Sequence, residues 1–341
     1  MRDSIHPPAS GILITMILAG DIGGTKTSLA LFAVESGRLL RSASTTVASA
    51  DYPGLAEAVA AFLMSPRPPI EAAAFGVAGP VVNGRVKTTN LPWIVDQDEM
   101  AKFLGSRVVR ILNDLEAMAW GIEQLDADDL LTLQPGEASP EGNAALIAAG
   151  TGLGEAILFR HEGKLVPSAS EGGHADFAPI DAEMDAFLKW LRDQRGHVSV
   201  ERVASGLGLE TIYPFFHDPA AGGSLPHARS SVEIGAAVAR AASSGECGGC
   251  SRTFGLFLRA LGAEAGNLAL KAKATAGVYI GGGVAYKNLE AMKDGRFLQA
   301  FRDKGRFAGF MERIPVHVIL DQTTPLLGAA LAAARAAGKM P

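Results

Sequence analysis

The stretch that decides the fold reads Ile111-Leu112-Asn113-Asp114-Leu115-Glu116-Ala117. The apolar residues before Asn113 have the pattern of a buried strand, and those after Asp114 have the pattern of a helix. Side chains between such a strand and helix face the crevice in which α/β proteins bind ligands. A carboxylate placed there can take a proton from a bound hydroxyl, which makes Asp114 a candidate general base. The alternative is that Asn113 and Asp114 only cap the helix, because both residue types are good caps.

Composition limits the possible classes of protein. The chain has 341 residues, too many for one comfortable core, and two domains are expected. Its hydrophobic fraction of 48% and charged fraction of 20% are typical of a globular protein with large buried sheets. A net charge of −5 predicts no nucleic-acid or anionic membrane partner, and no apolar run is long enough to span a bilayer. With only two cysteines, Cys247 and Cys250, the cytoplasm is the expected compartment.

Apolar runs alternate with helical patterns, which predicts a mixed α/β architecture. The expected strands are 17–19, 28–34, 72–77, 108–112, 144–148, 156–159, 278–280 and 316–320, with a hairpin at 81–87. The expected helices are 55–64, 92–103, 185–191, 231–242, 255–275 and 327–337, and the last should pack back on the first lobe. Residues 1–16 are expected to form a loose N-terminal extension. The order strand, glycine turn, strand occurs both at 17–34 and at 144–159, as two lobes of one plan would require.

Glycine turns are the first chemical signal, because they expose backbone N–H groups that can surround a phosphate. The turns are Gly20-Asp21-Ile22-Gly23-Gly24-Thr25, Gly150-Thr151-Gly152 and Gly281-Gly282-Gly283. A strand rather than a helix is expected after the first two, which separates them from P-loops and dinucleotide-binding folds. Asp21 could hold a magnesium ion, directly or through water, because hard cations prefer carboxylate oxygen. The alternatives are ordinary hairpin turns and, at Gly281-Gly282-Gly283, a flexible start of a helix.

Seven motifs in order resemble those of bacterial glucokinases from about Ile17 to Leu327. They are Asp21-Ile22-Gly23-Gly24-Thr25, Asn113-Asp114, Gly150-Thr151-Gly152-Leu153-Gly154, Glu171-Gly172-Gly173-His174-Ala175-Asp176-Phe177, Glu201-Arg202-Val203, Gly266-Asn267-Leu268-Ala269-Leu270 and Gly281-Gly282-Gly283. The resemblance implies an actin-like ATPase (ribonuclease H-like) fold, with mixed β-sheets in two lobes and a central cleft. We expect a small lobe of 17–123 plus 325–341 and a large lobe of 124–324.

The same resemblance implies an activity and roles for residues. The activity is transfer of a phosphoryl group from ATP, with Mg²⁺, to the 6-hydroxyl of glucose, by a homodimer. Asp114 would be the catalytic base, and Asn113, Asp114, Glu171, His174 and Glu201 would bind the sugar. The three glycine turns (Gly20, Asp21, Ile22, Gly23, Gly24, Thr25; Gly150, Thr151, Gly152; Gly281, Gly282, Gly283) would hold the nucleotide.

The chemistry of a hexose agrees with those sugar-binding residue types. Its hydroxyls need fixed acceptors, as Glu171 and Glu201 offer, and donors, as Asn113 and His174 offer. Glu171 and His174 could instead be a metal pair, or lie in a solvated loop. Cys247-Gly248-Gly249-Cys250 is one pair without the second pair of a usual structural zinc site, so structural zinc is not expected there, and a redox role is an alternative.

Three other functions fit parts of the sequence. The first is a kinase of another hexose or of an amino sugar. The second is a sugar-sensing regulator without catalysis, although the tail before Ile17 is short and proline-rich for a DNA-binding helix pair. The third is a polymerising ATPase, which would not need the cluster of sugar-binding residues from Glu171 to Glu201.

Overall fold

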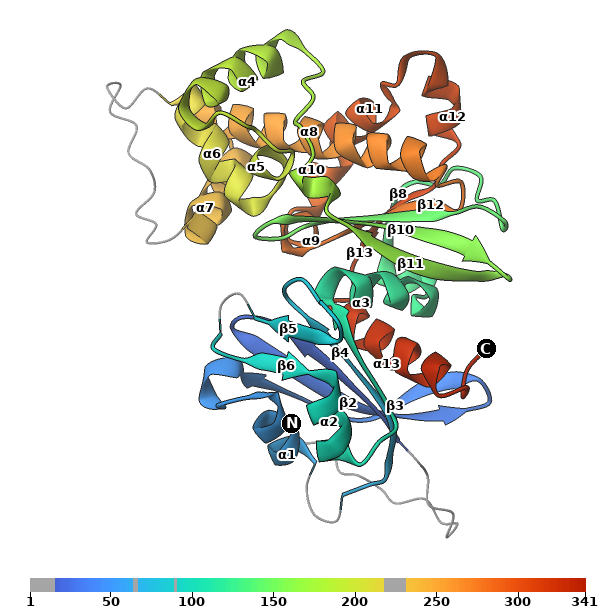
Figure 1. Ribbon diagram of the computed structural model, residues 1–341. Helices are drawn as coiled ribbons and strands as arrows, with labels where there is room; N and C mark the ends of the chain where they lie inside the picture. Colours follow the sequence, from blue (N-terminus) through green and yellow to red (C-terminus); the bar gives the residue numbers. More distant parts are fainter. Residues whose placement is uncertain (1–15, 64–66, 89–90, 218–230) are drawn as a thin grey trace. The chain divides into compact units, whose positions relative to one another are not determined.

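The computed structural model describes residues 16–63, 67–88, 91–217 and 231–341 (Figure 1). The chain divides into two compact units. The first unit runs up to Asp126 and takes in Asp321–Pro341, and the second unit is Ala127–Leu320. The boundaries expected from the sequence lie three and four residues away from these. Of the expected loose extension, 1–15 lie outside the described residues, and Met16 is the first residue of a strand.

The first unit is built on one mixed sheet with the strand order β3-β2-β1-β4-β7. Its strands are β1 (Met16–Ile22), β2 (Lys26–Glu35), β3 (Arg38–Ala48), β4 (Ile70–Val77) and β7 (Val108–Asn113). β1 pairs antiparallel with β2 and parallel with β4, and β4 pairs parallel with β7. The strands expected at 17–19, 28–34, 72–77 and 108–112 are confirmed. β3 was not expected, because this edge strand is largely exposed and polar.

Helices cover both faces of this sheet. Side chains of α1 (Leu55–Phe62) and α2 (Gln97–Leu104) share one buried cluster with Leu18, and those of α3 (Asp114–Gly121) and α13 (Thr324–Ala336) share another with Ile17. A Cβ at Gly328 of α13 would collide with the carbonyl oxygen of Ala117 in α3, so the backbones of these two helices touch. The expected packing of the C-terminal helix on the first unit is therefore confirmed.

The segment between β4 and α2 differs in part from expectation. Val82 and Arg85 exchange both backbone hydrogen bonds around Asn83 and Gly84, whose φ angles are +50° and +72°, so the tight hairpin is confirmed. The helix expected from residue 92 was placed too early. β6 (Ile94–Asp96) first pairs with β5 (Arg85–Lys87), and α2 follows because the Asp96 carboxylate accepts from the backbone N–H groups of its first turn.

The second unit repeats the plan of the first sheet and adds a strand at one edge. The strand order is β11-β10-β9-β12-β13-β8. The strands are β8 (Leu130–Gln134), β9 (Ala144–Ala149), β10 (Leu153–His161), β11 (Lys164–Ser170), β12 (Gly277–Gly281) and β13 (Val316–Ile319). β9 pairs antiparallel with β10 and parallel with β12, as β1 does with β2 and β4. The repeated order of strand, glycine turn and strand in the sequence thus corresponds to a shared sheet topology.

The helices of the second unit enclose its main hydrophobic core. They are α4 (Ala182–Arg195), α5 (Glu201–Ala204), α6 (Gly206–Phe216), α7 (Ser231–Ser243), α8 (Gly248–Ala272), α9 (Gly283–Lys287), α10 (Leu289–Lys293), α11 (Arg296–Arg302) and α12 (Ala308–Glu312). The helix expected at 255–275 begins earlier, because the sulfur of Cys247 caps it by accepting from the Cys250 N–H at 3.1 Å. In the described part of the chain, no helix has the length and apolarity needed to cross a membrane.

Candidate active site

Asn113 is the N-cap of α3, at the junction with β7. Its Oδ1 accepts hydrogen bonds from the N–H groups of Leu115 at 2.9 Å and Glu116 at 3.4 Å. Its Nδ2 donates to the carbonyl oxygen of Gly79 at 3.1 Å. Asn113 therefore caps the helix, as the alternative expected. The other hydrogen of its amide lies toward the carboxyl of Asp114, whose pKa it lowers by hydrogen bonding.

Asp114 is the first residue of α3 and is half-buried. Its Oδ1 accepts from the Leu115 N–H at 2.9 Å, and a carboxylate has further acceptor sites beyond that bond. Burial raises the pKa of Asp114, while hydrogen bonds from backbone N–H groups and from Asn113 act in the opposite direction. The result is a carboxylate with a raised pKa at the end of β7, as a base for a hydroxyl requires.

Asp21 in β1 is the electrostatic neighbour of Asp114. The two elements meet across Gly76, which pairs with Asp21 in the sheet and whose Cβ position lies 3.7 Å from the Cα of Asp114. Burial and then the charge of Asp114 raise the pKa of Asp21 to about 6. Both carboxyls of this acidic pair, Asp21 and Asp114, thus favour a bound proton or a cation nearby.

The first glycine turn is the connection between β1 and β2. The Gly23 N–H donates to the carbonyl oxygen of Lys26 at 2.9 Å, which closes a tight hairpin. Ser49 secures the turn, since its hydroxyl donates to the Gly23 carbonyl and its N–H donates to the Thr25 carbonyl, both at 3.0 Å. A strand follows directly, as expected, so the turn differs from a P-loop.

The second and third glycine turns meet in the second unit. Gly150-Thr151-Gly152 joins β9 to β10, and the Gly206 N–H at the start of α6 donates to the Gly150 carbonyl at 2.8 Å. Gly282 has φ +87°, and a Cβ there would collide with the Ala149 carbonyl. Only glycine therefore fits where the third turn passes the end of β9. The third turn is the start of a helix, because α9 begins at Gly283.

Glu171, His174 and Glu201 form one cluster, named here the carboxylate–imidazole cluster. His174 Nε2 lies 3.9 Å from Glu171 Oε2, and His174 Nδ1 lies 4.0 Å from Glu201 Oε1. The side chains are 84%, 64% and 28% exposed for Glu171, His174 and Glu201. Glu201 Oε2 accepts from the Leu153 N–H at 2.9 Å, and a Cβ at Gly152 would lie 2.5 Å from that oxygen. The cluster is thereby fixed to the second glycine turn.

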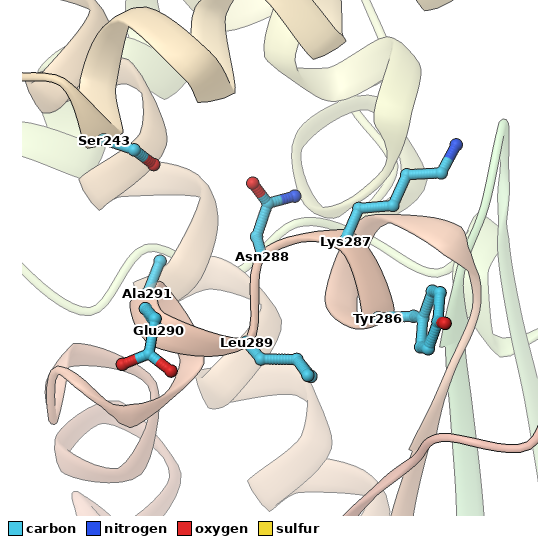
Figure 2. A pocket seen from close by; sticks show the side chains of 7 residues that line it. All are labelled: Ser243, Tyr286, Lys287, Asn288, Leu289, Glu290 and Ala291. Atoms are coloured by element: carbon cyan, nitrogen blue, oxygen red, sulfur yellow. The ribbon is translucent and has the colours of Figure 1, made fainter.

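A hollow of about 370 Å³ lies at α9 and α10, directly after the third glycine turn (Figure 2). Its lining residues are Ser243, Tyr286, Lys287, Asn288, Leu289, Glu290 and Ala291. Figure 2 shows Asn288 between Ser243 and Lys287, and the Asn288 amide donates to the Val284 carbonyl at 2.7 Å. The sequence did not single out these residues, because their pattern is that of an ordinary surface helix.

Glu155 is a further site residue whose role was missed. It is 1% exposed, and a Cβ at Gly172 would collide with its carboxylate, so it supports the loop that carries Glu171 and His174. Burial and then the charge of Glu264 raise the pKa of Glu155 to about 7, against a smaller opposing effect of Lys271. The sequence signal was a glutamate in the middle of a buried strand.

Comparisons with known proteins agree with this geometry. A sequence model of the glucokinase family matches residues 18–336. The glucokinases of Nostoc sp. (strain PCC 7120 / SAG 25.82 / UTEX 2576) and Synechocystis sp. (strain ATCC 27184 / PCC 6803 / Kazusa) are 41% and 36% identical to the chain. The alignment with the Nostoc protein covers 94% of this chain and 100% of that protein. The alignment with the Synechocystis protein covers 95% of this chain and 99% of that protein.

Solved structures show the same similarity. The crystal structure of glucokinase from an Antarctic psychrotroph has a TM-score of 0.84 at 31% identity, covering 94% of this chain and 99% of that one. A ROK family glucokinase from Streptomyces griseus, solved with glucose and AMPPNP, has a TM-score of 0.61 at 24% identity over 94% and 99%, and supports the fold alone. The chain has the α/β actin-like ATPase fold of these sugar kinases, and it belongs to the glucokinase family.

Proposed function

We propose that the chain transfers a phosphoryl group from ATP to the 6-hydroxyl of D-glucose, giving ADP and glucose 6-phosphate. Membership of the glucokinase family supports the reaction. The observation that carries the proposal is Asp114, a half-buried carboxylate with a raised pKa at the junction of β7 and α3. A base of this kind is what the transfer to a hydroxyl requires.

In this mechanism Asp114 accepts the proton of the sugar hydroxyl as the bond to phosphorus forms. Phosphoryl transfer needs little covalent help from a protein, so positioning and charge stabilisation dominate. The hydrogen bond from the Leu115 N–H to Oδ1 fixes the carboxylate. The remaining lone pairs of the carboxylate can still accept the proton of the sugar hydroxyl. Desolvation makes that carboxylate more basic than one exposed to water.

The carboxylate–imidazole cluster and Asn113 would hold the remaining sugar hydroxyls. Glu171 and Glu201 supply acceptors, and His174 and the amide of Asn113 supply donors. The bond from the Leu153 N–H keeps Glu201 in place. Such a set rejects analogues that lack a hydroxyl, because an unpaired polar group costs about 1–3 kcal/mol.

The three glycine turns would hold ATP through their backbone N–H groups. The hollow next to Gly283 suits the base or ribose of the nucleotide. The acidic pair fits a Mg²⁺ ion, held by Asp21 directly or through water, because a divalent cation would offset both the burial and the repulsion by Asp114 that raise the pKa of Asp21. When bound, that ion would neutralise charge on the phosphates. We also propose a cytoplasmic homodimer, on the resemblance and the cysteine count alone.

The test is a coupled assay for ADP with ATP and Mg²⁺ across glucose, mannose, fructose and glucosamine. We expect glucose to give the highest kcat/KM, with no ADP above background when sugar is omitted. A higher kcat/KM for another sugar would make that sugar the substrate. Binding of glucose without ADP formation would overturn the kinase and leave a sugar-sensing protein.

A further inference from the structure

Two cysteines and a histidine that the proposed reaction does not use lie together in the second unit. The His217 Nε2 and Cys247 Sγ atoms are 3.2 Å apart. These atoms and the Cys250 Sγ all lie within 4.8 Å of one another. Both cysteines are free; Cys250 is buried, and Cys247 and His217 are half-buried. The sequence alone did not connect His217 with the cysteines, because it stands 30 residues before Cys247.

We propose that His217, Cys247 and Cys250 form a Zn²⁺ site that ties the end of α6 to the start of α8. Thiolate and imidazole are the ligands that zinc prefers, and zinc sites with three protein ligands take water as the fourth. In a zinc tetrahedron, neighbouring ligand atoms lie roughly 3.5–3.8 Å apart. The three atoms therefore need shifts of about 1 Å or less to coordinate one ion.

The histidine is already oriented as a zinc ligand. Its Nδ1 lies 3.2 Å from the carbonyl oxygen of Tyr213, so the N–H is on Nδ1 and donates to that carbonyl, which leaves the Nε2 lone pair toward Cys247. The ring stacks on Tyr213 at 3.7 Å with an interplanar angle of 17°. Ligating histidines are usually held by such a bond from the other ring nitrogen.

Glycine between the cysteines makes room for the imidazole. A Cβ at Gly249 would collide with the ring of His217, so no larger residue fits there without displacing the ring. Cys247 caps α8, and the positive end of a helix stabilises thiolates. Two features of the loop thus favour a metal-bound pair at this position.

A bound ion would act on the stability of the second unit. Because Zn²⁺ would bind the folded chain and not the unfolded chain, it would raise the free energy of unfolding. The other end of α6 touches the second glycine turn through Gly206, so the ion would also fix that helix beside the proposed nucleotide site.

The test uses the full-length, reduced, chelator-treated chain titrated with Co²⁺ and then Zn²⁺. We expect one Co²⁺ per chain, a thiolate-to-cobalt charge-transfer band, the visible bands of tetrahedral Co²⁺, and displacement of both by Zn²⁺. Zinc should also raise the unfolding temperature. Absence of the charge-transfer band, or thiols that form a disulfide in air while the reduced chain binds no metal, would overturn the proposal.

The variants H217Q, C247S and C250S separate the three ligands, and H161Q, which changes an exposed histidine on β10, is the matched control. Each ligand variant should weaken Zn²⁺ binding by more than the roughly 10–100-fold lost with a partner that only orients a ligand. H161Q should bind as the unaltered chain does. Circular dichroism of the metal-free variants checks that they fold. If H217Q is folded and binds Zn²⁺ with unaltered affinity, the histidine is not a ligand and the site as proposed is wrong.

Discussion

The acidic pair of the first unit and the two exposed members of the carboxylate–imidazole cluster, Glu171 and His174, lie in opposite environments. The third member, Glu201, is 28% exposed and is half-buried like the pair. Asp21 and Asp114 are half-buried, and burial is the main cause of the raised pKa of each. Glu171 and His174 are 84% and 64% exposed, and their separation of 3.9 Å is longer than a hydrogen bond. Burial strengthens a carboxylate as a base, whereas exposure leaves its oxygens open to a ligand. The contrast supports the proposed division, in which Asp114 of the pair accepts the proton and the cluster binds the sugar hydroxyls.

The largest effect should come from Asp114→Asn, which keeps the shape of the side chain and removes the base. The amide oxygen can still accept from the Leu115 N–H, so α3 should start as before. We expect kcat to fall roughly 10²–10⁴-fold, the usual contribution of a general base. Glucose affinity, measured by calorimetry, should change little. Asp98→Asn, an exposed acid in the first turn of α2, is the control. A kcat within twofold of normal for Asp114→Asn would remove the base from the mechanism.

An intermediate effect should come from the cluster, where Glu201→Gln can be compared with Glu171→Gln. In Glu201→Gln, the amide oxygen of the new side chain can keep the Leu153 N–H bond, while the other oxygen, near His174, is lost as an acceptor. Loss of one buried acceptor is worth about 1–3 kcal/mol, so kcat/KM for glucose should fall roughly 5–150-fold. Most of that change should be in KM. The more exposed Glu171 should give a smaller loss.

Each of these two variants is the control for the other, because both remove one charge from the same cluster. Equal losses of kcat/KM would indicate that the charge of the glutamate matters and that its burial does not. A fall in kcat with unchanged KM for Glu201→Gln would place this residue with proton transfer and contradict the division between the two regions.

Local sequence patterns predicted the part of the fold that depends on near neighbours. The junction at Asp114 follows from an apolar run ending in a capping residue, and the glycine turns follow from residue type. Edge strand β3 was missed because its exposed polar residues lack a buried face. β6 was taken for helix because Ile94 and Val95 stand next to a strong helix start.

Contacts between distant residues were beyond the sequence patterns. The burial of Glu155 depends on the loop of Gly172 lying over it. The approach of Asp21 to Asp114 depends on two strand pairings and on the small residue Gly76 between them. His217 meets the cysteines only because α6 packs on α8. Each of these contacts results from tertiary packing. The residues that meet are too far apart in the sequence for a local pattern to predict the contact.

A smaller effect should be seen in the pH profile of Asp21→Asn. Repulsion between like charges is mutual, so the acidic pair titrates together, and the base works only when Asp114 is deprotonated. Activity of the unaltered chain should therefore fall as the pH drops, and it should do so at a higher pH than an ordinary aspartate would give, because the pKa of Asp114 is raised. Removing the charge of Asp21 should move this acidic limb of kcat/KM to lower pH, whatever the loss of absolute rate. An acidic limb that stays in place would show that the two carboxyls are not coupled.

The smallest effect on catalysis is expected at Glu155, under the loop of the cluster, where a substitution should act on stability instead. Its pKa is raised from 4.5 to about 7 in the folded chain, so the folded state holds the proton more tightly than the unfolded state. Below pH 4.5 both states are protonated, and as the pH rises to 7 the stability falls by about 3 kcal/mol in total. Glu155→Gln lacks this titration, so its unfolding temperature relative to the unaltered chain should be higher at pH 8 than at pH 5.

The difference between the two pH values is the informative quantity for Glu155→Gln. A buried glutamine amide costs free energy of its own, but that cost does not depend on pH and cancels in the comparison. Glu171→Gln, on the exposed side of the same loop, is the matched control and should show the smaller pH-dependent change. If both variants gave equal pH-dependent shifts, burial would not distinguish the two glutamates, and the contrast between buried and exposed carboxylates would fail within the second unit itself.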